Sequence, residues 1–278
     1  MESIAYLANR NFLLVAVDLH YEFQTEENTI VIPNARKVYT LNSGRNGISV
    51  IGNPIKITNI IRYLLKLHEL GYNKTFEEIL EEINDVFNSS SIDLMDTLKS
   101  MQKFVDGKKE VSIDSLYKEF GSNPDALTIL TDVLKAGQDT SIGLTHVVVF
   151  GWDEKANSVR VSHNVSIGNN LFGNEELLMD NNYLYIKFAS ASIGKGEDIS
   201  VLEKESIKNF QPFVIGEWDD DKDTVAAVID IGKTVLSEGL KKISPYAEEP
   251  NIVFYEMSFR TNYRFEEPTI SLCNVTVT

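Results

Sequence analysis

The stretch Ser3-Ile-Ala-Tyr-Leu-Ala-Asn-Arg-Asn-Phe-Leu-Leu-Val-Ala-Val-Asp18 decides the fold class of this chain. It holds two apolar runs of strand length, Ser3 to Ala8 and Phe12 to Asp18, joined by the polar residues 9–11. Short runs rich in β-branched and aromatic residues predict strands, and polar turn residues between two such runs predict an antiparallel hairpin. We therefore expect a β-hairpin over these residues.

Strands and helices alternate in groups along the rest of the chain. The apolar pattern predicts further strands at 29–32, 37–41, 47–51, 146–152, 158–165, 183–190, 251–260 and 269–277. Helical spacing predicts helices at 57–68, 75–87, 198–210 and 223–242, and polar composition predicts loops at 22–28 and 169–182. Strands that cluster in antiparallel groups, separated by paired helices, indicate an α+β fold rather than a doubly wound parallel sheet.

Composition and charge exclude several classes of protein. The 278 residues carry 26 basic and 41 acidic side chains, a formal net charge of −15. This balance argues against nucleic-acid binding and against binding to an anionic membrane. The single cysteine, Cys273, excludes an internal disulfide framework and a cysteine-rich zinc site. With no secretory signal and no apolar run of bilayer length, we expect a cytoplasmic protein.

Motifs for cofactors and metals are absent from the sequence. Gly232-Lys-Thr234 looks like the end of a phosphate-binding loop, but the glycine required five positions earlier is Ala227. None of the four histidines has a histidine or cysteine neighbour at ligand spacing, and the run Asp219-Asp-Asp221 is interpreted as a solvated loop before a helix. We therefore predict no cofactor and no bound metal.

Several segments together carry a resemblance to a known family. The predicted hairpin leads to Arg36-Lys-Val-Tyr-Thr-Leu41 and then to Gly47-Ile-Ser-Val-Ile-Gly52 before a long helix. Later come Val149-Phe-Gly-Trp-Asp153 with the strand that follows it, and the glycine turn Ala191-Ser-Ile-Gly-Lys-Gly196 before a helix. This order of elements resembles the proteasome β-subunit family, with its HslV-like and Anbu-like bacterial relatives, which are N-terminal nucleophile hydrolases.

The resemblance implies a fold and an assembly. The family fold is a four-layer αββα sandwich, in which two antiparallel sheets lie between helix layers. The likeness covers most of the chain, so we expect one domain over residues 1–278, with a helical elaboration at about 90–140. The family habit of stacking subunits implies a homo-oligomer, as a ring or a stacked assembly, with a peptide or protein as the possible substrate.

The resemblance also implies a catalytic site. In this family a threonine, serine or cysteine at the mature N-terminus attacks an amide carbonyl, and its own α-amine is the base. Asp18 matches the supporting aspartate and Lys37 matches the supporting lysine, whose ammonium would favour the deprotonated nucleophile. An ordinary ion pair at the rim of a sheet is the alternative interpretation of these two residues.

The nucleophile is where this chain departs from the family pattern. Alignment from Asp18 without a gap puts Glu2 at the nucleophile position, and alignment on Ile4 puts Met1 there. Ser3 is the nearest hydroxyl, and its use requires removal of both preceding residues. The family serine between the glycines of its turn is Lys195 here, and 244–250 has no matching motif. The candidate catalytic residues are thus Ser3, Asp18 and Lys37.

Three functional hypotheses follow from these residues. The first is a proteasome-like protein with lost or reduced peptidase activity and an assembly or binding role. The second is an active amide or peptide hydrolase that uses Ser3 after removal of Met1 and Glu2. The third is a binding protein that retains the sandwich as a scaffold.

Overall fold

The structure is a computed structural model, and it places a defined set of segments of the chain. The described residues are 2–24, 29–32, 35–41, 44–52, 74–88, 100, 103–104, 113–123, 144–167, 170–179, 183–191, 196–210, 222–244, 247, 251–258 and 262–265. The expected helix at 57–68, the expected strand at 269–277 and most of the expected elaboration at 90–140 lie outside these residues.

The first sheet is built around the hairpin that opened the sequence analysis. Its strands are β1 (Ser3–Asn9), β2 (Phe12–Asp18), β10 (Tyr185–Ser190) and β11 (Ile252–Ser258), in the order β10-β1-β2-β11 and all antiparallel. Asn9 closes the hairpin, because its side-chain Oδ1 accepts the backbone N–H groups of Asn11 and Phe12 at 2.8 and 3.1 Å. Both central strands are buried on both faces, as their continuous apolar runs predict.

The second sheet contains five antiparallel strands in sequence order. They are β5 (Val38–Leu41), β6 (Asn46–Ile51), β7 (Leu144–Asp153), β8 (Ser158–Ile167) and β9 (Asn170–Leu178). The predicted strands at 146–152 and 158–165 pair as an antiparallel hairpin, with Asp153 opposite Ser158 at the turn. A separate two-stranded ribbon pairs β3 (Tyr21–Gln24) with β4 (Thr29–Ile32).

Two loop predictions were wrong. β3 occupies the first part of 22–28, and β9 occupies most of 169–182. The sequence of each segment is polar and favours a loop, but each strand gains a ladder of backbone hydrogen bonds from a neighbour, β4 and β8 respectively. Tertiary pairing therefore overrides local composition at both places.

The described helices lie against the sheets or beyond them. They are α2 (Phe76–Asn88), α4 (Ile113–Phe120), α6 (Gly196–Ser206), the short 3₁₀-helix η3 (Ile207–Phe210) and α8 (Lys222–Ile243). The predicted helix at 75–87 starts with a capping box: the Thr75 N–H donates to Glu78 Oε2 at 2.8 Å, and the Glu78 N–H donates to Thr75 Oγ1 at 3.3 Å. The segment Gly232–Thr234 lies inside α8, as the failed phosphate-loop pattern predicted.

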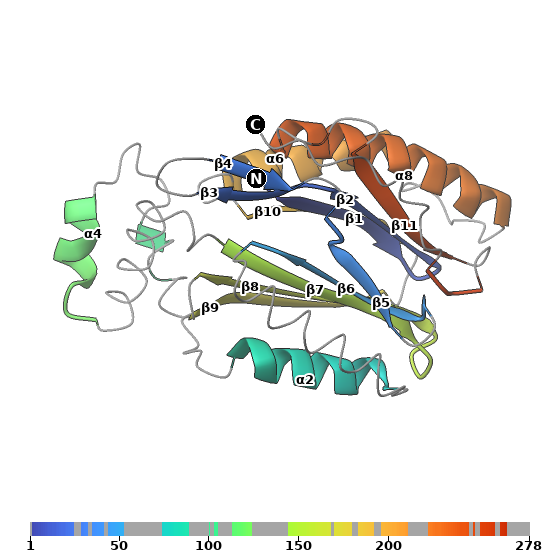
Figure 1. Ribbon diagram of the computed structural model, residues 1–278, viewed down its shortest axis with the longest axis horizontal. Coiled ribbons are helices and arrows are strands. Elements are labelled where there is room, and N and C mark those ends of the chain that lie inside the picture. The colour runs from blue at the N-terminus through green and yellow to red at the C-terminus, as the bar shows by residue number, and fades with distance from the viewer. Residues whose placement is uncertain are drawn as a thin grey trace.

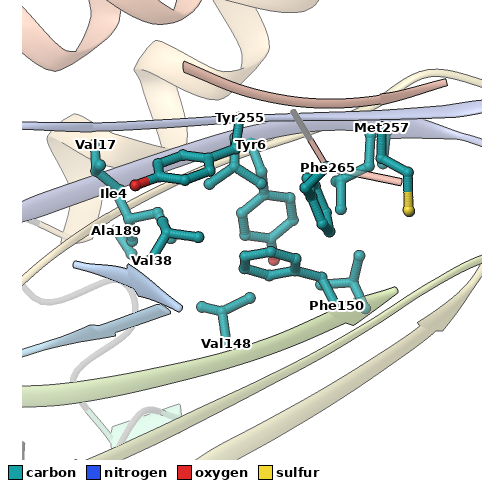
Figure 2. Close-up of a cluster of buried hydrophobic side chains, with 14 of the residues drawn as sticks. Ile4, Tyr6, Val17, Val38, Val148, Phe150, Ala189, Tyr255, Met257 and Phe265 are labelled. Carbon is teal, nitrogen blue, oxygen red and sulfur yellow. The ribbon is translucent and has the colours of Figure 1, made fainter. Parts of the chain in front are cut away.

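Three buried apolar clusters connect these elements. The largest draws side chains from both sheets, and Figure 2 shows Tyr6, Tyr255, Phe150 and Phe265 converging within it. A second cluster joins the other face of β1 and β2 to α6 and α8, and a third joins β6 and β7 to α2. In Figure 1, α6 and α8 lie on one side of the stacked strands and α2 lies on the other. The protein is thus a mixed α/β fold with two antiparallel sheets.

Candidate active site

Asp18 and Lys37 form a fully buried ion pair at the end of β2. Lys37, one residue before β5, donates from Nζ to Asp18 Oδ1, and both side chains have 0% exposure. The same carboxylate accepts the His20 N–H at Oδ1 (3.2 Å) and the Ser3 N–H at Oδ2 (2.8 Å). Three donors on one carboxylate offset part of the cost of taking it out of water. The pair therefore ties the first sheet to the segment that enters the second.

Ser3 lies in the site through its backbone and not through its hydroxyl. Its N–H binds Asp18, but its Oγ is buried and has no hydrogen-bond partner, so neither Lys37 nor any other described group activates it. Side chains alternate along a strand, so Ser3 shares a face of β1 with Ala5 and Leu7, which belong to the cluster beneath α8. With the chain intact, the structure brings all three predicted site residues together but leaves the predicted nucleophile unactivated.

Glu2 lies on the opposite face, in the space between the sheets. It precedes β1 and by alternation shares the face of Ile4 and Tyr6. Its side chain is 5% exposed, and Oε2 accepts the Gly52 N–H at 2.8 Å, while its backbone carbonyl accepts the Ala191 N–H at 3.0 Å. Burial raises the pKa of this carboxyl to about 7, against the opposing effects of the Lys37 charge and the Gly52 N–H. Glu2 is thus a buried acid that changes charge near neutral pH.

Gly52, whose N–H binds Glu2, lies at a position that only glycine can occupy. Gly52 has φ of +113°, in the left-handed region, and an added Cβ would lie 2.0 Å from the Leu144 carbonyl oxygen. This backbone conformation at the end of β6 places the N–H against the Glu2 carboxylate. A backbone donor at a strand end, beside a buried ammonium, is a suitable arrangement for holding negative charge on an oxygen atom.

A chain of hydrogen bonds runs next to this site. Tyr6 OH contacts His163 Nδ1 at 3.3 Å, His163 Nε2 contacts His146 Nδ1 at 2.9 Å, and His146 Nε2 contacts the Ser190 carbonyl at 3.0 Å. A carbonyl only accepts, so His146 Nε2 carries the proton and its Nδ1 must accept from His163. His163 Nδ1 then accepts from Tyr6. The chain is fully satisfied with both imidazoles neutral.

Burial keeps these histidines neutral. It lowers the pKa of His146 to about 4, with the nearby Lys187 charge acting in the same direction. Burial also lowers the pKa of His163 well below its usual value, and the neighbouring His146 adds to that effect. The pair therefore supplies hydrogen bonds and not charge at neutral pH.

The described residues contain no group of three or more histidine, cysteine, aspartate or glutamate side chains able to hold a metal ion. Among the same residues, no helix combines the length and apolar character needed to cross a bilayer.

A scan against protein-family models finds no match, and a search of curated proteins finds no significant match either. The site must therefore be interpreted from its own geometry.

Sequence reasoning missed the two buried histidines. They were set aside because neither has a ligand-type neighbour along the chain. The signal lay in the two predicted strands: when they pair as a hairpin with Asp153 opposite Ser158, His146 lies opposite Val165 and thus diagonal to His163. The contact of Gly52 with Glu2 joins residues fifty positions apart, so no local pattern could have predicted it.

Proposed function

We propose that this chain is a proteasome-like protein of the N-terminal nucleophile hydrolase superfamily in which Glu2 takes the nucleophile's place. In this proposal the intact chain does not hydrolyse peptides and acts by assembly or by binding, in the cytoplasm. The observation that carries it is the environment of Glu2: a buried carboxylate that accepts the Gly52 N–H next to the Asp18–Lys37 pair. A carboxylate there cannot perform the hydroxyl chemistry of the family.

The proposal includes the four-layer αββα arrangement of the family. It is supported by the three apolar clusters, one between the sheets and one on the outer side of each sheet. Their helix partners are α6 and α8 for the first sheet and α2 for the second.

A gain-of-function substitution tests the role assigned to Glu2. Cells normally remove methionine before a small residue, so Glu2→Thr should leave threonine at the N-terminus, next to Lys37 and the Gly52 N–H. We expect wild type to leave fluorogenic peptides intact and to resist acylation by a β-lactone. The Glu2→Thr protein should hydrolyse peptides or add one acyl group at its hydroxyl, with opening of the lactone ring, as an intact-mass measurement would show.

Matched variants separate this chemistry from other effects. Glu2→Ala also loses its methionine but has no hydroxyl, so it should remain inactive. Adding Lys37→Met to Glu2→Thr should abolish the gained reaction. If Glu2→Thr is folded, begins at the introduced threonine and reacts no faster than Glu2→Ala, position 2 is not a nucleophile position and the proposal is wrong.

A second candidate is a hydrolase that uses Ser3 after removal of Met1 and Glu2. One observation favours it: the Ser3 nitrogen lies 2.8 Å from Asp18 Oδ2, so a new α-ammonium there would gain an ionic partner. The intact mass of the purified protein decides between the candidates. A mass that begins at Met1 excludes the Ser3 hydrolase. A mass that begins at Ser3, with peptide hydrolysis lost in Ser3→Ala, would replace our first proposal.

A further inference from the structure

A cavity of about 460 Å³ opens at the end of the second sheet, remote from Glu2. Its walls include Asn46 at the start of β6, Trp152 at the end of β7 and Phe76 at the start of α2. The cavity and the Glu2 site lie at opposite ends of β6, because Asn46 pairs with Gly151 while Ile51, next to Gly52, pairs with His146. Its volume is within the range of small-ligand sites.

The charges that line the cavity favour an anion. Three carboxylates contribute to the lining, and each has a cationic partner: Glu154 pairs with Arg45, and both Glu77 and Asp153 pair with Arg160. Lys155 and Arg264 also line it, and neither has an anionic partner among the described residues. Two unpaired cations at one concave surface are a site for a group such as phosphate.

The aromatic part of the wall is backed by a turn in a strained backbone conformation. Tyr263 stacks on the indole of Trp152 with 3.7 Å between ring centroids and 25° between planes. Asn262 and Tyr263 have φ of 52° and 56°, a left-handed conformation that costs a bulky residue on the order of 1 to 2 kcal/mol. The Phe265 N–H anchors the segment on the Gly44 carbonyl at 2.7 Å. This strained turn presents Arg264 to the cavity beside a flat aromatic surface.

We propose that this cavity binds a nucleoside phosphate: its phosphate pairs with Lys155 and Arg264, and its base lies against Trp152. A planar ring and an anionic group within one small molecule match these two features of the wall. This proposal is independent of the role assigned to Glu2.

Isothermal titration calorimetry on the full chain tests the site. We expect adenosine 5′-monophosphate, guanosine 5′-monophosphate or cytidine 5′-monophosphate to bind with Kd below about 1 mM. Adenosine and inorganic phosphate, which each lack one half of the ligand, should bind at least about tenfold more weakly. Arg264→Ala and Lys155→Ala should each weaken the nucleotide about fivefold to tenfold, because each removes one charge-assisted contact.

The control is Lys204→Ala, which removes an exposed lysine from α6 and should leave affinity unchanged. The substituted cations are on the surface, so these variants should fold like wild type. The proposal is overturned if none of the three nucleotides binds below about 1 mM. It is equally overturned if phosphate alone binds as tightly as the nucleotide, or if Lys204→Ala weakens binding as much as Arg264→Ala.

Discussion

At the scale of single residues, the unusual group in this protein is the Glu2 carboxyl. A glutamate that is 5% exposed would ordinarily be paired and charged, yet burial raises the pKa of Glu2 to about 7 even with Lys37 nearby. Lys37 is already engaged by Asp18, so its charge only partly offsets the desolvation of a second carboxylate. The site therefore holds two acids and one base, and Glu2 is the acid that takes up a proton.

This predicts a stability that falls as pH rises. Glu2 has a folded pKa of about 7 and an ordinary value of 4.5, so its contribution is complete below pH 4.5 and is lost as pH rises to 7. Glu2→Gln should remove that slope and stabilise the protein at pH 8 by up to about 3 kcal/mol. Urea unfolding between pH 4.5 and 8 measures both effects. Glu205→Gln, at an exposed position on α6, should retain the wild-type slope.

Equal slopes for wild type and Glu2→Gln between pH 4.5 and 7 would contradict the assignment. The histidines act in the opposite direction over the lower part of this range. The decisive quantity is therefore the difference in slope between wild type and Glu2→Gln, in which the contribution of the histidines cancels.

At the scale of elements, the His146–His163 contact joins two strands of the second sheet to the first sheet. His146 on β7 and His163 on β8 lie diagonally across the ladder, and the chain extends to Tyr6 on β1 and to the Ser190 carbonyl on β10. Other groups that face it are Tyr185, which stacks on Tyr6, and the Lys187 ammonium, which disfavours positive charge on both rings. Protonation of His146 would place its Nδ1–H against the Nε2–H of His163, and protonation of His163 would remove the acceptor that the Tyr6 hydroxyl uses.

We therefore predict acid sensitivity with a defined sign. The pKa of His146 is about 4 in the folded protein against an ordinary 6.5, so the stability it supports is complete above pH 6.5 and is lost as pH falls toward 4. The loss is on the order of 3 kcal/mol. His163→Gln should be less stable than its parent at pH 7 but should show a shallower loss in acid.

The measurement is best made in the Glu2→Gln background, where the opposing slope is absent. Urea midpoints at pH 7, 6, 5 and 4.5 would then report on the histidines, with Glu2→Gln alone as the reference. Equal slopes with and without His163→Gln would show that the pair does not titrate between folded and unfolded states. The hydrogen-bond assignment of the chain would then have to be revised.

At the scale of the whole molecule, the proposed family membership predicts self-association. The first sheet ends at β10 and β11 and the second at β5 and β9, so the described strands leave unpaired edges. Leu178 at the end of β9 is 48% exposed and Tyr183 just before β10 is 70% exposed. Large apolar side chains that are exposed beside strand ends suit contacts with other copies of the chain.

Native mass spectrometry at micromolar concentration tests this prediction. We expect a defined homo-oligomer of two or more copies. A spectrum that contains only monomer would remove the prediction. If an oligomer is observed, Leu178→Lys tests whether β9 forms its interface, since a smaller assembly than wild type would implicate that strand. Val201→Lys, at an exposed apolar position on α6, is the matched control.

The sequence by itself determined the strands whose side chains are continuously apolar and the helices with strong caps. The hairpin of β1 and β2 and the capping box at Thr75 depend on neighbours two to three residues away, so local pattern suffices. The sequence also indicated Asp18, Lys37 and Ser3 as candidate catalytic residues, although through resemblance to a family and not through any local rule. The sequence did not predict the polar strands β3 and β9, because their stability comes from pairing with neighbouring strands and not from composition.

Only the tertiary structure decided what these residues face. Ser3 and Glu2 are adjacent in sequence, yet strand alternation turns the hydroxyl away from the sheet interface and the carboxylate into it. The pKa of Glu2 depends on burial, on Lys37 and on Gly52, and the cavity draws residues from positions 45 to 264. Desolvation and long-range contact are properties of packing, which a one-dimensional pattern does not contain.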